Sequence, residues 1–468
     1  MKRRILTTIS LILLLSDVSC ARRRDGFFSP HRPTVTRIGN GIEVMTIEDR
    51  EFPTAQFFFY IRGGSVYDPP GKEGLAGIAM QTLRLGGADG LSPDKIEDDL
   101  EFVGASLEMG TSAEYESASL NLLTKDLDHG LDTLFHLLRK PALDPRRFGI
   151  VKARAKDAIL RDQEDPIKLA VREFSPFVYG PGSPWGRHAT PATIDNISLD
   201  DVKSFLQKAI VPERILVAAA GDFSAEEITQ KIASRVQDWK ASGEKLAEIP
   251  PLEEKFEKGA IVLSRPELTQ SSILVGHLGG KRENQDKFPL LVMNFILGGS
   301  GALTSRMGEE IRSSSGKAYS VWSDFGFGRD YGLFRAVAQT ALENTDWVAK
   351  KMALMIRDTH DQAAFSDAEV ASAERAILRS LIFDFETRFA QVREQALFHL
   401  WGYPADYIET FQKKIGDVTP GDVGRAAKKY LHPDGLKVLI VTDEKKAAEV
   451  QAAIKELGYQ GQVESKRY

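Results

Sequence analysis

Two residues in the second half of the chain, Arg312 and Tyr319, have side chains that could act together on a carbonyl group. A fixed guanidinium can hold a carbonyl oxygen, and a phenol hydroxyl can donate a hydrogen bond to an oxygen that gains negative charge. Such a pair needs a connection that turns both side chains into one cleft. The ordinary alternative is an Arg on a solvated helix end and a Tyr packed at the start of a strand.

The residues around this pair predict a helix followed by two strands. Apolar residues recur every four positions and predict a helix with one buried face that ends near Arg312, at Leu303, Met307 and Ile311. Residues Tyr319–Phe325 and Tyr331–Thr340 are rich in aromatic and β-branched side chains and are separated by turn residues, which predicts two strands. The two candidate residues would therefore converge where the helix leads into the first strand.

This segment resembles the second half of the pitrilysin/insulinase-type peptidases. The spacing from Arg312 to Tyr319 and the string YSVWS…GLF match that family's pattern. In the family, an Arg and a Tyr in this helix-to-strand connection reach across to the backbone of the substrate. The resemblance therefore implies that Arg312 and Tyr319 bind a peptide substrate.

The resemblance also implies a metal site in the first half, and this chain lacks its ligands. Active members carry H-x-x-E-H on a helix after a Gly-Leu-Ala entry, with two His ligands for zinc and a Glu as general base. Here the Gly-Leu-Ala entry is residues 74–76, and the two His positions and the Glu position hold Gly77, Gln81 and Met80. The family's third zinc ligand is a Glu on a later helix, and Asp157 falls near that position. A thioether and an amide bind zinc poorly, and one carboxylate cannot hold the ion alone. We therefore expect no cofactor on this chain and no hydrolysis by the chain alone.

No other residues offer a replacement catalytic site. None of the eight histidines has another histidine three or four positions away, and no G-x-S-x-G motif occurs. The glycines at 298–301 and 326–328 lack the Lys-Ser/Thr ending or the glycine spacing of nucleotide-binding loops. Nucleophilic catalysis and nucleotide binding are therefore not supported.

The amino terminus has the layout of an export signal. Three basic residues precede the apolar run Ile5–Leu15, which is too short to span a bilayer. Residues 1–19 are predicted to be a signal peptide, and residues 20–32 a tether. Cys20, the only cysteine, follows a small residue as in lipoprotein cleavage sites, so two forms remain open: a lipid-anchored protein and a soluble periplasmic one. Both place the chain in the bacterial cell envelope.

The composition is that of a soluble globular protein with more than one domain. The chain has 468 residues, 42% of them hydrophobic and 27% charged, which is too long for one ordinary core. The formal net charge is −5, which argues against a nucleic-acid footprint.

An internal repeat divides the chain into two similar halves. The segment 194–198 matches 415–419 at an offset of 221 residues, and Gly63-Gly64 matches Gly279-Gly280 at an offset of 216. Strands and helices occur in groups, which predicts an α+β class with helices on one side of a mainly antiparallel sheet. Ser224 and Glu227 also predict a capping box for the last helix of the first half.

We therefore predict two homologous lobes that form a clamshell. The first lobe spans residues 33–239 and the second residues 259–468, with a linker at 240–258 that contains Gly, Pro and acidic residues.

Together, the resemblance and the missing ligands predict a non-catalytic, substrate-binding subunit of a heteromeric zinc peptidase. A zinc-bearing homologous subunit is the expected partner, a peptide is the expected substrate, and a membrane would be contacted only through a lipid anchor. The alternative is a structural homologue that supports an envelope or membrane-associated complex and has no role in proteolysis.

Overall fold

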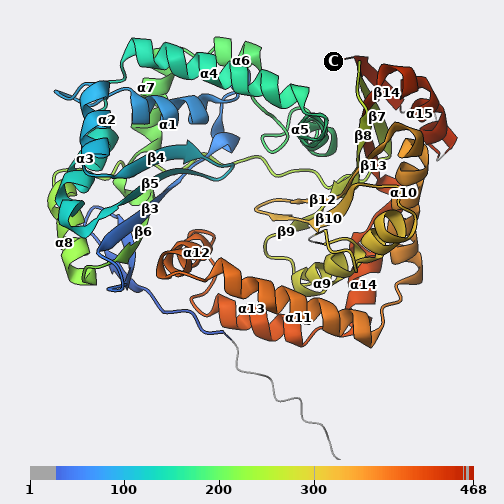
Figure 1. Cartoon of the computed structure of the whole chain (residues 1–468). Helices are drawn as coiled ribbons and strands as arrows, with labels where there is room; N and C mark the ends of the chain where they lie inside the picture. The colour runs from blue at the N-terminus through green and yellow to red at the C-terminus, as the bar shows by residue number, and fades with distance from the viewer. Residues whose placement is uncertain (1–27, 300, 457, 460–462, 468) are drawn as a thin grey trace, which may run out of the picture.

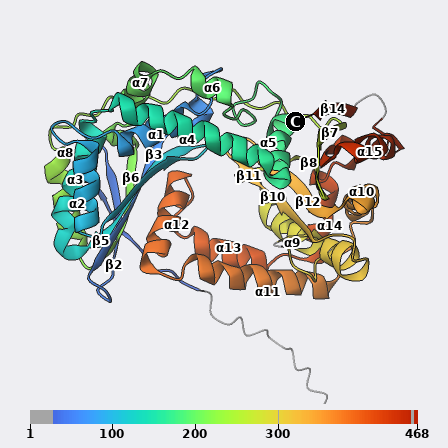
Figure 2. The same cartoon turned by 45° about the horizontal axis from the view of Figure 1, so that its top comes forward.

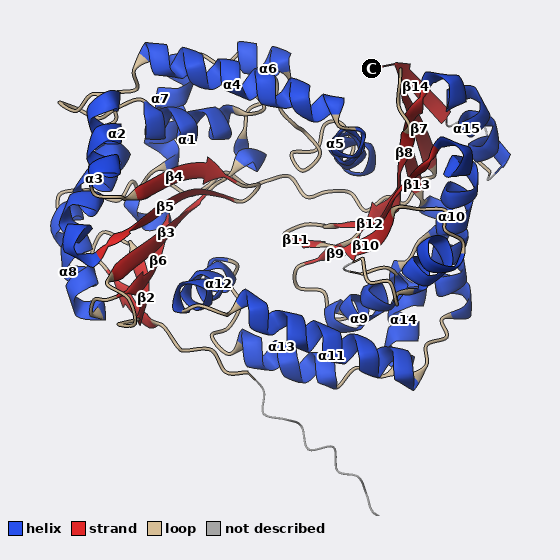
Figure 3. Ribbon diagram, viewed as in Figure 1, coloured by secondary structure: helices blue, strands red, loops and turns tan. Residues whose placement is uncertain are grey.

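The computed structural model describes residues 28–299, 301–456, 458–459 and 463–467, which form two lobes (Figure 1). The predicted signal peptide and Cys20 lie outside the described residues, as does Ser300 in the glycine-rich turn. Each lobe is built on a six-stranded, mainly antiparallel sheet with helices packed on it (Figure 3). The predicted α+β class and two-lobed architecture are therefore confirmed.

The first sheet has the strand order β1-β2-β6-β3-β5-β4, so β1 and β4 are its edge strands. Only β2 and β6 are parallel neighbours. Phe57 and Phe59 of β3 are fully buried beneath the helices of this lobe, because alternate residues of a strand point to the same face. The strands are β1 Thr34–Arg37, β2 Glu43–Glu48, β3 Thr54–Arg62, β4 Ser106–Thr111, β5 Tyr115–Leu123 and β6 Ile215–Gly221. The helices are α1 Leu75–Leu85, α2 Pro93–Phe102, α3 Leu127–Arg139, α4 Pro145–Glu164, α5 Pro166–Tyr179, α6 Pro191–Asp195, α7 Leu199–Ala209 and α8 Ala225–Val236.

The second sheet repeats this plan with the order β10-β12-β8-β13-β7-β14. Strand β10 occupies the edge that β4 occupies in the first sheet, and β13 takes the place of β6. The larger strands are β7 Gly259–Arg265, β8 Gln270–Leu278, β10 Ser320–Phe325, β12 Leu333–Ala341, β13 Lys437–Asp443 and β14 Val463–Arg467. A small separate sheet pairs β9 Gly280–Lys281 with β11 Phe327–Gly328. The helices are α9 Lys287–Leu297, α10 Thr345–Gln362, α11 Asp367–Asp384, α12 Arg388–Leu400, α13 Tyr407–Gly416, α14 Pro420–Tyr430 and α15 Glu444–Glu456.

The two halves exchange one helix each, which the sequence repeat did not reveal. Helix α5, from the first half, packs on the second sheet, and α12, from the second half, packs on the first sheet (Figures 1 and 2). The buried apolar residues at these two contacts are Leu169, Ala170 and Phe174 of α5 and Val392, Ala396 and Leu400 of α12. Each sheet is therefore covered on both faces, so the prediction of helices on one side of the sheet is wrong, and the lobes are joined by two apolar interfaces.

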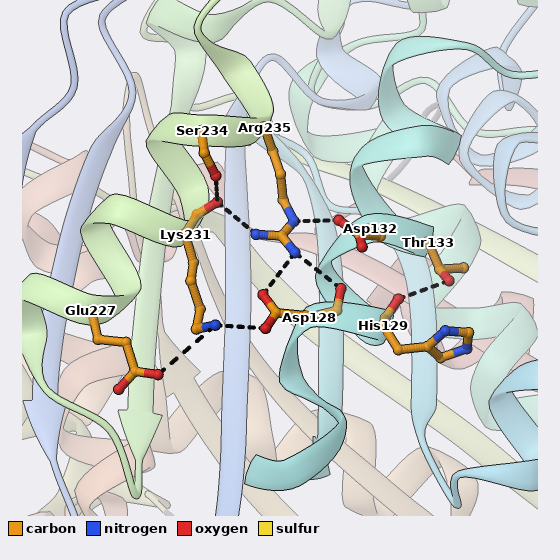
Figure 4. A network of polar contacts seen from close by, with 8 residues as sticks. All are labelled: Asp128, His129, Asp132, Thr133, Glu227, Lys231, Ser234 and Arg235. Carbon is orange, nitrogen blue, oxygen red and sulfur yellow. Dashed lines mark hydrogen bonds and ion pairs between the residues drawn. The ribbon is translucent and has the colours of Figure 1, made fainter.

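An ion-pair network joins α3 to α8 on the outside of the first lobe (Figure 4). Asp128 accepts hydrogen bonds from Lys231 at 2.7 Å and from Arg235 at 2.9 Å. Ser224 caps α8 by accepting a hydrogen bond from the backbone N–H of Glu227, as predicted. The predicted return contact of a capping box is replaced by an ion pair, because the Glu227 carboxylate lies 3.9 Å from the Lys231 ammonium.

Residues 240–258 contain no helix or strand, and contacts with both lobes hold them in place. Arg214 of the first lobe donates a hydrogen bond to the Glu244 carbonyl oxygen, and Asp330 of the second lobe accepts one from the Leu252 backbone N–H. The Phe256 ring then stacks on a histidine of the second lobe. Among the described residues, no helix is both long and apolar enough to cross a membrane.

Candidate functional site

The three changed positions of the H-x-x-E-H helix lie on α1, next to the edge strand β4. Met80 is fully buried in the core of the first lobe, so its sulfur is enclosed by apolar side chains. Gln81 is exposed, and its Nε2 donates a hydrogen bond to the carbonyl oxygen of Met109 on β4. A side chain at Gly77 would touch Thr111 of the same strand. Gln81 therefore ties α1 to β4, and the three positions present no set of metal donors.

Asp157 lies on the exposed side of α4, the helix that packs against α1. A zinc ion needs about four donors, usually imidazole, thiolate or carboxylate groups. Within the described ranges, no three His, Cys, Asp or Glu side chains form a group that could hold a metal ion. The zinc of the peptidase family therefore does not fit the residues of this chain, because Met80 is enclosed and the Gln81 amide is already bonded.

Arg312 lies on a π-helix, Gly308–Ser314, a rare form that is frequent at functional sites. The regular helix predicted from Leu303 is therefore wrong at its start: Leu303 lies in a turn and is 51% exposed, whereas Met307 and Ile311 are buried as predicted. Gly308 explains part of this geometry, because a side chain there would collide with a backbone carbonyl of the preceding turn.

Backbone hydrogen bonds hold the connection between Arg312 and Tyr319 in one shape. The Lys317 N–H donates to the Ile311 carbonyl oxygen at 3.2 Å, which folds the connection back onto the helix. The Thr340 hydroxyl donates to the Lys317 carbonyl oxygen at 2.5 Å, and the Tyr319 N–H donates to a carbonyl oxygen of β12 at 2.9 Å. Both ends of the connection are therefore fixed to the second sheet.

The side chains of Arg312 and Tyr319 make no polar contacts that would stabilise the described fold. Both residues are exposed, Tyr319 by 59%, and neither side chain has a hydrogen bond or ion pair with another described residue. Tyr319 directly precedes β10, which begins at Ser320, so the predicted strand start is one residue too early. The role of the two residues in binding a substrate stays a prediction.

Strand β10 is an edge strand, and the glycine-rich turn covers one end of it. The Ser323 N–H donates to the Gly298 carbonyl oxygen at 2.8 Å, and Ser323 forms a parallel bridge with Gly299. Gly301 has φ +63°, a backbone conformation that favours glycine, as is usual in such a turn. The other end of β10 carries Tyr319. An edge strand of this kind can accept an added peptide strand through its backbone groups.

Two buried carboxyl groups lie near the start of α1, and neither was predicted from the sequence. Glu116 is fully buried, and its Oε1 accepts a hydrogen bond from the Gly64 N–H at 2.6 Å. Asp68 accepts hydrogen bonds from the Gly74 and Ala76 N–H groups at the start of α1. Burial raises the pKa of Glu116 to about 7 and that of Asp68 to about 6, against the opposing effect of these hydrogen bonds.

The position of Glu116 in its strand could have indicated that this carboxyl group is buried. Strand β5 alternates between buried and half-exposed residues, and Glu116 falls on the buried side with three apolar residues. A charged residue in an apolar series of a strand indicates a specific polar partner.

Two family models match the chain. The model described as "Insulinase (Peptidase family M16)" matches residues 43–168, and the model described as "Peptidase M16 inactive domain" matches residues 196–377. The first match contains α1 with its altered zinc positions, and the second contains Arg312 and Tyr319.

Similar proteins cover nearly the whole chain. An uncharacterized zinc protease of Streptomyces coelicolor is 23% identical over 90% of this chain and 92% of its own length. A protein named non-peptidase homolog YmxG, from Helicobacter pylori, is 25% identical over 86% of this chain and 93% of its own length. A probable mitochondrial-processing peptidase subunit beta of Arabidopsis thaliana is 23% identical over 86% of this chain and 77% of its own.

The fold is also that of solved structures. The crystal structure of a peptidase M16 inactive domain from Pseudomonas fluorescens superimposes with a TM-score of 0.80 and 23% identity, covering 88% of this chain and 98% of that chain. A protease from Helicobacter pylori superimposes with a TM-score of 0.77 and 16% identity, covering 88% of this chain and 100% of that chain.

Proposed function

Because this chain belongs to peptidase family M16, we propose that it is the non-catalytic, substrate-binding subunit of a heteromeric zinc-dependent peptidase. The family models, the non-peptidase homologue and the unsuitable donors on α1 support a pseudo-peptidase. In this proposal, a homologous partner subunit carries the zinc ion, and this chain supplies Arg312 and Tyr319. The substrates are unfolded peptides of the cell envelope.

One observation carries the proposal. Arg312 and Tyr319 are exposed and have no partner among the described residues, yet the connection between them is held by backbone hydrogen bonds and includes a π-helix. These bonds fix the backbone that carries the two side chains, while the side chains themselves stay unbonded. A fixed backbone that presents free hydrogen-bond donors is what binding and catalysis require.

Each residue has a distinct part in this proposal. The Arg312 guanidinium binds a carbonyl oxygen of the peptide, because its planar N–H groups hold an acceptor in a fixed direction. The Tyr319 hydroxyl donates to the oxygen that gains charge when the scissile carbonyl is attacked. The partner's zinc would activate the attacking water. The free end of β10 lies next to Tyr319 and can align the peptide backbone.

We also propose that the chain is exported and held in the cell envelope, with Cys20 as the site of a lipid anchor. The start of the described chain supports one orientation: Gln412 of α13 donates to the Phe28 carbonyl oxygen at 2.7 Å, and Gln395 of α12 donates to the His31 carbonyl oxygen at 2.9 Å. An anchor at Cys20 would then hold the α12–α13 face toward the membrane. Membrane fractionation tests this, because Cys20→Ala should release the protein into the soluble fraction.

The proposed function can be tested in the complex purified from the native host. A tagged chain is isolated with its bound partners, and cleavage of a quenched fluorescent unfolded peptide is measured. Combining Arg312→Ala with Tyr319→Phe should lower kcat/KM by about a hundredfold, the effect typical of losing an oxyanion donor. Arg357→Ala, which changes an exposed arginine on α10, is the matched control and should leave kcat/KM unchanged.

The same experiment separates this proposal from a structural role. If the double variant assembles normally and cleaves at the wild-type rate, the chain is a scaffold and the proposal is wrong. If the purified complex contains no zinc-bearing homologue, the proposed partner does not exist.

A further inference from the structure

A groove of about 350 Å³ lies between α9, α11 and α13 in the second lobe. Its wall is mainly apolar and includes Leu291, Phe295, Ile377, Leu381, Ile408 and Phe411. A volume of this size can hold one or two large apolar side chains of a ligand. The groove therefore offers an apolar binding surface away from the altered zinc positions.

One ammonium group, that of Lys287, lies at the end of this groove. Its Nζ donates hydrogen bonds to the hydroxyl oxygens of Tyr403 at 2.9 Å and Tyr407 at 2.8 Å. It also lies 4.9 Å from the centre of the Tyr403 ring and 5.6 Å from that of Phe327, within the range of cation–π attraction. Burial, together with the nearby Arg282, lowers the pKa of Lys287 to about 8, so the group remains mostly charged at neutral pH.

No carboxylate of the described residues pairs with this ammonium, although acidic residues lie close by. Asp286, the preceding residue, accepts hydrogen bonds from Lys429 and Tyr430 at 3.0 Å. Glu114 of the first lobe pairs with Arg282. A partly buried ammonium usually has a carboxylate partner. These two acids are thus engaged elsewhere, and Lys287 forms no ion pair with a described residue.

We propose that this groove binds the carboxyl terminus of a polypeptide whose last residue is apolar. The terminal carboxylate pairs with Lys287, and the last side chain fills the apolar part of the groove. This inference rests on the proposed function as a polypeptide-binding subunit and specifies one end of the polypeptide. Carboxylate and ammonium are complementary in charge, and the pair is strengthened by the low polarity around it.

The connection to β10 favours a polypeptide over a free fatty acid. Asn294 and Gly299 line the groove, and both also contact Ser323 of β10. The groove therefore adjoins the covered end of β10, three residues along the strand from Ser320, and a peptide aligned on the free end can extend toward it. Contacts with the peptide backbone would add to those of the terminal residue, which an isolated acyl chain could not make.

The inference can be tested with two short peptides and the full chain. An N-acetylated hexapeptide that ends in Phe is compared with the same peptide carrying a carboxyl-terminal amide, by titration calorimetry at pH 7. The free acid should bind at least about tenfold more tightly, because only it pairs with the ammonium. Lys287→Met should remove this difference. Lys281→Met, which changes an exposed lysine nearby, should preserve it.

Two further arms keep the result unambiguous. Leu291→Trp fills the groove but retains Lys287, and it should weaken binding of the free acid. Equal binding of acid and amide by the wild-type chain would overturn the inference. So would decanoate that binds as tightly as the peptide with the same dependence on Lys287, since the site would then be one for acyl chains. If Arg312→Ala weakens the amidated peptide while Lys287→Met does not, the proposed function survives without this groove.

Discussion

Glu116→Gln should stabilise the protein much more at pH 8 than at pH 5. Burial raises the pKa of Glu116 from 4.5 to about 7 in the folded chain. The folded state therefore keeps this proton to a higher pH than the unfolded state, and wild-type stability falls as the pH rises from about 4.5 to about 7. The difference of about 2.5 between the two pKa values corresponds to about 3.4 kcal/mol of stability lost by pH 8, of which only about 0.8 kcal/mol is already lost at pH 5.

Urea unfolding at the two pH values measures this effect. The free energy of unfolding of Glu116→Gln, minus that of the wild type, should grow by about 2.5 kcal/mol between pH 5 and pH 8. Titrating groups that do not interact with Glu116, such as the buried His277, are present in both proteins and cancel. Glu108→Gln, an exposed change on β4, is the matched control and should show no such growth. A difference that does not depend on pH would refute the reasoning.

Three other predictions follow from packing and charge. Phe174→Ala empties a fully buried site between the halves and should lower the free energy of unfolding by about 3 to 5 kcal/mol, measured by urea unfolding. Gly308→Ala should disturb the π-helix, which hydrogen exchange of residues 306–314 would detect, and should weaken peptide binding. Asp128→Ala should cost no more than about 1 kcal/mol, because its carboxylate is exposed, and the cost should shrink in 1 M salt.

Much of the fold could be predicted because the signals are local or repeated. The offset of 221 residues, predicted from the match of 194–198 with 415–419, is kept by the helices that follow these segments, α7 and α14. The four-residue spacing of Met307 and Ile311 correctly predicted that both are buried. Each of these features depends on neighbouring residues or on a match within the chain.

The missed features depend on contacts between distant residues. The exchange of α5 and α12 cannot be seen in a repeat, because each helix keeps its expected place in sequence while it packs on the other sheet. The π-helix at Arg312 depends on the fit of Gly308 against the preceding turn, which the apolar spacing does not encode. The groove at Lys287 likewise joins three helices and a residue of a fourth.

The most direct test of the account is the binding of an unfolded polypeptide to the isolated chain. Fluorescence anisotropy with labelled, reduced and carboxymethylated α-lactalbumin gives the dissociation constant for the wild type, for Arg312→Ala and for the control Arg357→Ala. We expect the wild type and the control to bind equally, and Arg312→Ala to bind about tenfold more weakly, the loss of a charge-assisted hydrogen bond. Equal binding by all three proteins, or no binding by any, would contradict the account.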